Sequence, residues 1–499
     1  MGSAALVASL ATPARLVEIS GALALTLLLY AALVTVERRG YHTELLTVIV
    51  GLIAFESIMW SQDSVPVGIF HPKLAGQNFR LYDILIPIAL LARLRVRGLP
   101  KRVSALGFVV FVFCFWYMCE AVIGVMRGYG LNNVLFEAKL VIYVGGAYVL
   151  AAGVRAEDIL GDHGIRRLAR PLAVVTLVLL ALTAGGGGIN IPVPTLNVTG
   201  LAGVQPDAAT FFLGLGVITL LVELASPRRR LTMVAAGIVL MLSALGSSQR
   251  ASLIALAAGV SFAAVGWLVP VNRRRRIRLT PTEVLGTATV LAGGIAAYPL
   301  LTGASNWDLG DLPLASLVSR TFTSTGKAQS AADRVAQYHA ALPDVMKHLV
   351  LGWGLAIPTT YIAVGQTVAT QSPDDVYLSI VLRTGLFGLL VFAALAVTAI
   401  VVVVRVFRDH PDPKVAALAW GCGTIVVAIL VRGSVEGIFE KYRLAIELGL
   451  ALGMAQSAMA SLVRRRPPAQ SAVGIAPPST KPPERSADQL AALGASTPQ

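Results

Sequence analysis

Four arginines and two adjacent aspartates are the residues of this sequence best suited to chemistry on a phosphorylated substrate. A guanidinium group is planar and binds phosphate oxygens in pairs, and a carboxylate can remove a proton from a hydroxyl group. Most of these residues lie in the region 302–388, which begins as a polar segment longer than most other connections in the chain. The six residues are Arg250, Arg320, Arg334, Asp374, Asp375 and Arg383.

Asp374 and Asp375 stand where this polar segment meets an apolar run. One interpretation is helix capping, because a carboxylate at a helix N-terminus accepts backbone N–H groups and meets the positive end of the helix dipole. A second is a general base close to the membrane surface. A third is binding of a divalent cation, although no further set of ligands accompanies the pair. The sequence leaves all three open.

Arg250 and Arg383 are charged residues beside or within apolar runs. Arg250 ends the short polar break 247–250, so it is either an interfacial arginine that reaches lipid headgroups or a phosphate ligand at the bilayer edge. Arg383 lies about two turns into an apolar run, where a charge costs about 3 kcal/mol on insertion scales. We therefore expect Arg383 either to form a structural ion pair or to contact the substrate.

Weaker patterns accompany these residues. Residues 332–345 have the periodicity of an amphipathic helix that places Arg334 and Tyr338 on one face. The sequence Gly352–Gly354 predicts a tight turn that another backbone can approach closely. Charged residues near the starts of apolar runs, which either pair with one another or line a polar vestibule, are Asp83, Glu137 and Lys139.

Membrane helices must position these groups. The 499 residues are 56% hydrophobic and 14% charged, with a mean hydropathy of +0.73, whereas a soluble protein has about 25% charged residues. Apolar runs of about 20 residues recur, each long enough to cross the hydrocarbon as a helix. The predicted fold is all-α, a polytopic transmembrane bundle of about 12–13 spans. The expected spans are 19–37, 44–62, 81–94, 103–124, 136–154, 168–184, 208–225, 231–247, 251–270, 282–302, 376–404, 413–434 and 442–463.

The net charge of +14 is attributed to the topology of a membrane protein rather than to nucleic-acid binding. Of the 41 lysines and arginines, 25 fall in seven stretches that follow every second expected span. This bias predicts that these stretches and the C-terminus are cytoplasmic. The other, extracytoplasmic side then carries the polar break at Arg250 and the long polar segment. The three cysteines lie in apolar runs and indicate neither a disulfide framework nor a zinc site.

The expected organisation has four parts. About ten spans precede a large, partly helical extracytoplasmic loop, which the last three spans and a disordered cytoplasmic tail follow. The tail is assigned from its content of proline, alanine and serine. The four ranges are 1–302, 303–375, 376–463 and 464–499.

The order of these motifs resembles the O-antigen ligase and polymerase family of bacterial polysaccharide enzymes. The polar break is similar to the family's Ser-x-x-Arg-Ala-x-Leu motif, matched by Ser247, Arg250, Ala251 and Leu253. An arginine, a Gly-x-Gly turn and a Gly-Leu-x-Gly helix follow as in the family. The chain departs from the ligases at Asp374 and Asp375, which stand where ligases have histidine and asparagine; some polymerase-like relatives resemble it more closely there.

The resemblance implies an inverting, metal-independent glycosyltransferase of the cytoplasmic membrane that requires no cofactor. Its donor would be a polyprenyl-diphosphate-linked glycan and its acceptor a glycan or a lipid. Asp374 or Asp375 would be the base, and the diphosphate would be held by arginines. Those arginines would be Arg250 and Arg334, with Arg383 and Arg320 as further candidates. The alternatives are a transporter or flippase of the same lipid-linked glycan, and a non-catalytic membrane scaffold.

Overall fold

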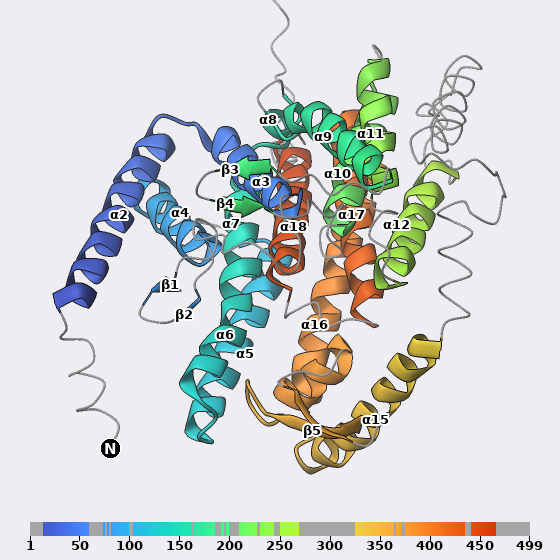
Figure 1. Cartoon of the computed structure of the whole chain (residues 1–499). Helices are drawn as coiled ribbons and strands as arrows, with labels where there is room; N and C mark the ends of the chain where they lie inside the picture. The colour runs from blue at the N-terminus through green and yellow to red at the C-terminus, as the bar shows by residue number, and fades with distance from the viewer. Residues whose placement is uncertain are drawn as a thin grey trace, which may run out of the picture. The chain divides into compact units, whose positions relative to one another are not determined.

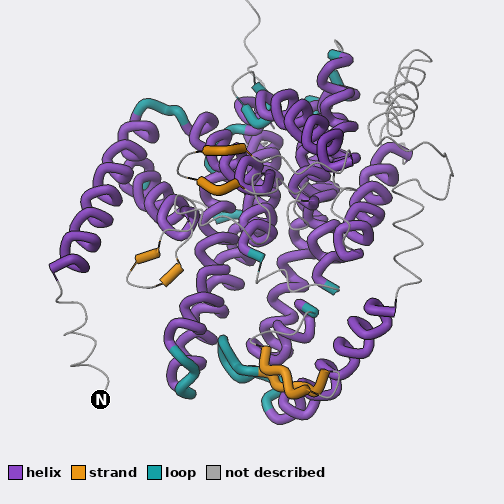
Figure 2. The backbone as a smooth tube through the Cα atoms, in the orientation of Figure 1, coloured by secondary structure: helices purple, strands orange, loops and turns teal. Residues whose placement is uncertain are grey.

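The computed structural model is a bundle of α-helices to which short β-hairpins are attached (Figures 1 and 2). Twelve of the thirteen expected spans coincide with helices, and the tenth, at 282–302, lies outside the described residues. The structure describes residues 13–58, 73–74, 77–78, 81–98, 103–161, 164–184, 191–193, 196–198, 209–226, 230–243, 250–268, 325–363, 366–370, 375–434 and 441–465.

The helices follow the apolar runs of the sequence closely. The N-terminal helices are α2 (Pro13–Arg38), α3 (His42–Ile58), α4 (Leu81–Arg97), α5 (Ala105–Met126), α6 (Leu131–Val141), the π-helical turn η1 (Ile142–Gly146), α7 (Ala147–Ala152), α8 (Ala156–Ile159) and α9 (Arg166–Ala184). The later helices are α10 (Ala209–Leu224), α11 (Leu231–Ser243), α12 (Arg250–Leu268), α15 (Thr325–Lys347), α16 (Val376–Asp409), α17 (Pro413–Gly433) and α18 (Tyr442–Arg465).

Three antiparallel hairpins are present within the described ranges. Each consists of two short strands that pair only with each other, so the fold remains all-α. The strands are β1 (Lys73–Leu74), β2 (Gln77–Asn78), β3 (Ile191–Val193), β4 (Leu196–Val198), β5 (Thr359–Ala363) and β6 (Gln366–Thr370).

Several helices have the length and hydropathy needed to cross a membrane. Within the described part of the chain there are five, and α16 has the highest mean hydropathy of them, 2.9. Four shorter apolar helices accompany them. The five ranges are Ala105–Met126, Leu131–Ala152, Val376–Asp409, Pro413–Gly433 and Tyr442–Arg465. The prediction of an all-α, multi-pass membrane protein is confirmed.

The core is built around α16 and α17. Helix α5 packs along α16, α16 packs along α17, and α17 contacts both α10 and α12. Aromatic rings fill these contacts, with Phe113 of α5 against Phe392 of α16 and Trp420 of α17 stacked on Phe262 of α12. Packing of this kind replaces the hydrophobic effect as the force that holds helices together within a bilayer.

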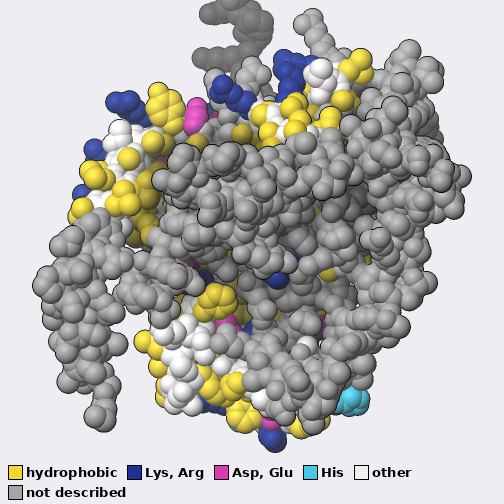
Figure 3. All heavy atoms as spheres, in the orientation of Figure 1, with side chains coloured by type: hydrophobic (Ala, Val, Ile, Leu, Met, Phe, Trp, Pro, Cys, Tyr) yellow, Lys and Arg dark blue, Asp and Glu magenta, His cyan; other side chains and the backbone are white. Residues whose placement is uncertain are grey.

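Basic residues that follow the first, third and fifth expected spans lie at one end of the bundle, within the described part of the chain. Arg97, after the third span, has its Nε atom 3.7 Å from Oε2 of Glu37 in the first span. Nη1 of Arg93 donates to the carbonyl oxygen of Leu150 in the fifth span at 2.8 Å. Figure 3 shows several basic side chains grouped at the end that carries the α2–α3 turn and α11. This convergence is the arrangement that the charge distribution requires. The side of the membrane that this end faces stays a prediction.

The other end holds the described part of the long polar segment. Helix α15 and the β5–β6 hairpin lie there, beside the start of α16 and away from α8 and α9 (Figure 1). The periodicity predicted a helix over 332–345, and the observed helix is longer, from Thr325 to Lys347.

Helix α16 is interrupted at Gly385, about two and a half turns from its start. Gly385 has φ +67° and ψ −173°, which is outside helical geometry and favours glycine. The N–H groups that lose their helical partners are satisfied by the segment 349–354. Leu386 donates to the carbonyl of Leu349 at 2.7 Å and Phe387 to that of Val350 at 3.3 Å.

The same segment also satisfies carbonyl groups on the other side of the break. Trp353 N donates to Leu382 O at 3.0 Å and Gly354 N to Arg383 O at 2.9 Å. Both Gly352 and Gly354 have positive φ, at +74° and +86°. A Cβ atom on Gly352 would lie 2.3 Å from the carbonyl oxygen of Arg383. The predicted tight turn and its close backbone approach are confirmed.

We predict that Gly385→Ala destabilises the protein by about 3 kcal/mol. The new Cβ would lie 2.2 Å from the carbonyl oxygen of Val350, and it adds overpacking to the strain of a positive φ. Gly128→Ala is the matched control. Gly128 has φ +82°, but a Cβ atom there would meet nothing within 4 Å, so only about 1 kcal/mol of strain is expected. Thermal unfolding of the detergent-solubilised variants measures the difference, and equal losses would contradict the docking described above.

Candidate functional site

Asp375 links the long polar segment to α16. It is the N-cap of α16, where its carboxylate accepts a hydrogen bond from Leu378 N at 3.0 Å. The same carboxylate accepts a hydrogen bond from the Tyr338 hydroxyl of α15. The capping interpretation is thus confirmed for Asp375, and a carboxylate with about four lone-pair sites keeps capacity for a further partner. Asp374 lies outside the described residues.

Arg383 forms a buried ion pair with Glu137. Its Nη2 atom lies 2.7 Å from Glu137 Oε1, and the two side chains are only 4% and 11% exposed. Arg383 also donates to the hydroxyl of Ser379 one turn earlier. Glu137 accepts a second hydrogen bond, from Ala356 N at 2.8 Å. Of the two alternatives for Arg383, the structural ion pair is therefore present, and its partner, Glu137, comes from α6.

Asp83 and Lys139 form a second pair nearby. Lys139 Nζ lies 2.7 Å from Asp83 Oδ2, and the Tyr143 hydroxyl donates to the other carboxylate oxygen. These residues come from the start of α4 and from the α6–η1 region. Of the two alternatives left open by the sequence, direct pairing is the one that the structure contains.

Glu120 is a further candidate site residue, which lies outside the motifs of the sequence. It is fully buried in α5, and neither carboxylate oxygen has a hydrogen-bond partner within the described ranges. Its backbone carbonyl accepts a hydrogen bond from Leu355 N at 3.1 Å, so it lies against the turn that docks on α16. A lone acid inside an otherwise apolar span is costly and typical of functional sites. That signal was available in the sequence of 105–126.

Arg250 is the first residue of α12. The contacts between α12 and α17 show at which end of the bundle α12 begins. Trp420 Nε1 donates to Ala263 O at 3.3 Å, and Gly259 faces Ala428, so α12 and α17 run antiparallel. Arg250 thus begins its helix at the end of the bundle where α17 finishes. The hydroxyl of Tyr377 donates to Leu430 O at 2.7 Å at that same end. The start of α12 and the start of α16 therefore share one end.

Arg334 lies in α15, one turn before Tyr338. Helix α15 is held by a small cluster of apolar side chains that it shares with α16 and the turn before β5. That cluster consists of Ala341, Val345, Ile357 and Leu382. Residues four apart lie on one helix face, so the backbone places Arg334 on the face that meets Asp375. The side chains of Arg250 and Arg334, and all of Arg320, lie outside what the structure describes.

His348 and Trp353 close the turn between α15 and β5. The two rings meet edge to face at 4.0 Å between centroids, and Trp353 Nε1 donates to Asp344 O at 2.7 Å. The guanidinium of Arg127 lies 4.8 Å from the centre of the Trp353 ring. This end of the bundle therefore combines fixed carboxylates, guanidinium groups and aromatic rings, which suits binding of an anionic, sugar-bearing lipid.

Comparison with known proteins gives one result that bears on this site. Residues 235–393 match the family model described as O-antigen ligase. The matched segment runs from α11 past the break in α16, and it contains all six candidate arginines and aspartates. No curated protein matches the chain.

We predict that Glu137→Gln destabilises the protein by about 3–5 kcal/mol. The substitution leaves the charge of Arg383 buried without its carboxylate, which is far more costly than breaking an exposed pair. Asp344→Asn is the matched control, because it breaks the exposed Lys347–Asp344 pair at 2.9 Å and is expected to cost less than about 1 kcal/mol. Thermal unfolding and membrane abundance measure both effects. Equal behaviour of the two variants would show that the Arg383–Glu137 pair does not stabilise this end.

Proposed function

Because residues 235–393 match the family model described as O-antigen ligase, we propose that this protein is a membrane enzyme of polysaccharide biosynthesis that acts as an inverting glycosyltransferase. Its donor is an oligosaccharide linked to polyprenyl diphosphate, and transfer takes place on the outer face of the cytoplasmic membrane. Transfer to an acceptor or extension of a polymer are both compatible with this chemistry. The observation that carries the proposal is the meeting of the starts of α12 and α16 at one end of the bundle, within the matched segment.

The proposed reaction is a single displacement. An acceptor hydroxyl attacks the anomeric carbon of the lipid-linked sugar and forms the glycosidic bond, while the bond between that carbon and the diphosphate oxygen breaks. The proton of the hydroxyl passes to Asp374 or Asp375. Lipid diphosphate leaves with the bonding electrons. No nucleotide or metal enters the balance.

Arginines stabilise the negative charge on the departing diphosphate in this proposal. Arg250, at the start of α12, is the first proposed contact, and Arg334, one turn before Tyr338 in α15, is the second. Charged donors that meet a developing oxyanion in a water-poor site are among the largest contributions to catalysis. Arg320 is proposed as a further diphosphate contact.

Arg383 is supported in a different role from the one the resemblance implies. Its guanidinium meets Glu137 and Ser379, directly before the break in α16. We assign to Arg383 the role of keeping Glu137 and the backbone before the break in α16 in position, and any contact with the diphosphate is secondary to that role. Asp375 has a comparable double task, because its carboxylate caps α16 and binds Tyr338.

We predict that Arg250→Ala lowers the rate of lipid diphosphate release by about 10²–10³, the loss typical of removing one donor to a developing oxyanion. Asp374→Asn and Asp375→Asn are compared with it, and the base is the one whose loss abolishes transfer. Purified protein in detergent with lipid-linked oligosaccharide supplies the assay. Arg39→Ala, an exposed arginine at the opposite end, is the matched control.

The outcomes of this assay test the diphosphate site and distinguish an enzyme from a transporter. Wild-type rates in Arg250→Ala at equal protein amount would reject the diphosphate site. Absence of lipid diphosphate with the wild-type protein, accompanied by movement of intact lipid between leaflets in vesicles, would identify a transporter of the lipid-linked glycan instead.

A further inference from the structure

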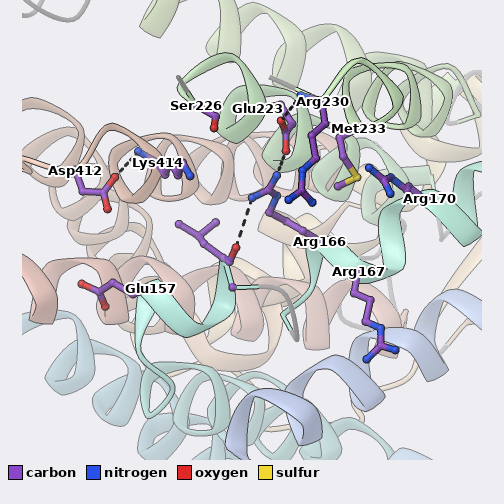
Figure 4. A pocket seen from close by; sticks show the side chains of 12 residues that line it. Glu157, Arg166, Arg167, Arg170, Glu223, Ser226, Arg230, Met233, Asp412 and Lys414 are labelled. Atoms are coloured by element: carbon purple, nitrogen blue, oxygen red, sulfur yellow. Dashed lines mark hydrogen bonds and ion pairs between the residues drawn. The ribbon is translucent and has the colours of Figure 1, made fainter. Parts of the chain in front are cut away.

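A cavity of about 740 Å³ lies at the basic end of the bundle, far along α16 and α17 from the candidate active site. This volume is within the range of about 300–1,000 Å³ that small-molecule sites occupy. Its walls come from the α8–α9 region, the end of α10, the start of α11 and the start of α17 (Figure 4). The lining residues are Glu157, Leu160, Gly161, Arg166, Arg167, Arg170, Glu223, Ser226, Arg230, Met233, Asp412 and Lys414.

Glu223 forms the deep wall of this cavity and is already neutralised. Its carboxylate is 1% exposed and forms an ion pair with Arg166. It also accepts a hydrogen bond from Arg230 N at 3.1 Å. This one acid therefore ties the start of α9 to the α10–α11 turn, and its charge does not offset the other cations of the cavity.

Asp412 is likewise engaged in local structure. It is the N-cap of α17, and its carboxylate accepts a hydrogen bond from Lys414 N at 2.9 Å. In Figure 4 the side chain of Glu157 points away from the group formed by Arg166, Arg170 and Arg230. The acids of the lining are thus engaged in capping and in ion pairing, or face elsewhere.

Two of the remaining cations, Arg170 and Arg230, converge without an acidic partner in the described part of the chain. Arg170 and Arg230 extend toward Met233 from two sides (Figure 4), and no salt bridge of either side chain, or of the Lys414 ammonium, is found within the described ranges. Like charges that gather in a concave, low-dielectric wall raise the local positive potential and attract an anion. The five basic residues of the lining outnumber its three acids, so the cavity keeps an excess of positive charge that an anion can balance.

We propose that this cavity binds the phosphate group of an anionic lipid headgroup from the leaflet at the basic end of the bundle. Guanidinium groups match phosphate oxygens in geometry and in charge. Basic pockets between transmembrane helices on the cytoplasmic side are suited to such headgroups, and the charge distribution assigns this end to the cytoplasm. Leu160 and Met233 give the lining an apolar portion beside the glycerol backbone. A bound phosphate would join α9, α11 and α17, and so stabilise the folded state.

Equilibrium binding of fluorescent phosphatidylglycerol to the detergent-solubilised full-length protein tests this site. We expect phosphatidylglycerol to bind at least about tenfold more tightly than phosphatidylcholine and to raise the melting temperature. The double substitution Arg170→Gln, Arg230→Gln is expected to weaken phosphatidylglycerol binding at least about tenfold, since each basic residue at an anionic headgroup contributes about fivefold.

Controls separate this site from general surface charge. Arg95→Gln removes an exposed arginine from α4 outside the cavity, and it should bind the lipid as the wild type does. Lys414→Gln is the second cavity variant, and it should also weaken binding. It tests the site independently, so the test remains valid even where the double substitution disturbs the fold. The melting temperature of each variant without lipid shows whether the fold is intact.

The outcomes are distinct. Displacement of the lipid by millimolar glycerol 3-phosphate or inorganic phosphate would confirm a phosphate site and identify a soluble phosphate as a competing source of the ligand. Equal affinity for phosphatidylglycerol and phosphatidylcholine would overturn the proposal. So would wild-type binding by both cavity variants, or the same loss in Arg95→Gln. None of these readouts depends on glycosyl transfer, so this proposal and the proposed enzymatic function can fail separately.

Discussion

The backbone hydrogen bonds between the interrupted turn of α16 and the segment 349–354 are the constraint on which the rest of the polar end depends. We call this set of hydrogen bonds the seal. A break in a membrane helix exposes N–H and carbonyl groups, and such groups are tolerated at membrane depth only when protein or water satisfies them. Here one short segment satisfies both sides of the break, through Leu349 and Val350 on one side and Trp353 and Gly354 on the other. The segment 349–354 is therefore packed into the bundle and does not simply lie on its surface.

The seal also determines where the charges lie. Arg383 precedes the break, and Glu137, which pairs with it, also binds the backbone of Ala356 after the docked segment. The ion pair and the seal thus support each other. Removing two charges from water is costly, so pairs such as Arg383–Glu137 contribute more to a unique arrangement than to net stability. A fixed arrangement of charges is what electrostatic catalysis requires, because the groups need not reorganise during the reaction.

The two ends of the bundle differ in how their charges are used. At the end of α15, the described charges are mostly paired between helices or buried, as in Lys139–Asp83 and Glu120. At the basic end, one acid is paired and several cations face a cavity. We interpret the first end as a preorganised site for transfer chemistry and the second as a site that takes its counter-charge from the surrounding lipid. The same helices, α16 and α17, run between them.

The sequence alone determined the class of fold and the positions of nearly all helices, and its motifs showed a resemblance to the O-antigen ligase and polymerase family. Apolar runs of membrane-spanning length can only be helices, and alternating basic stretches order their ends, so these features follow from local composition. It also predicted the turn at Gly352–Gly354, and it offered the cap at Asp375 as one of three interpretations, because both features depend on neighbouring residues. Only the tertiary structure decided that Arg383 meets Glu137, residues 246 apart in the chain, and that α16 opens at Gly385 to receive another segment. Those outcomes depend on which helices pack against each other. Helical periodicity predicts which face of a helix is buried, but it does not predict which helix packs against that face. Glu120 was visible as a charge in an apolar span, but its burial and the hydrogen bond from Leu355 N to its backbone carbonyl required the packed bundle.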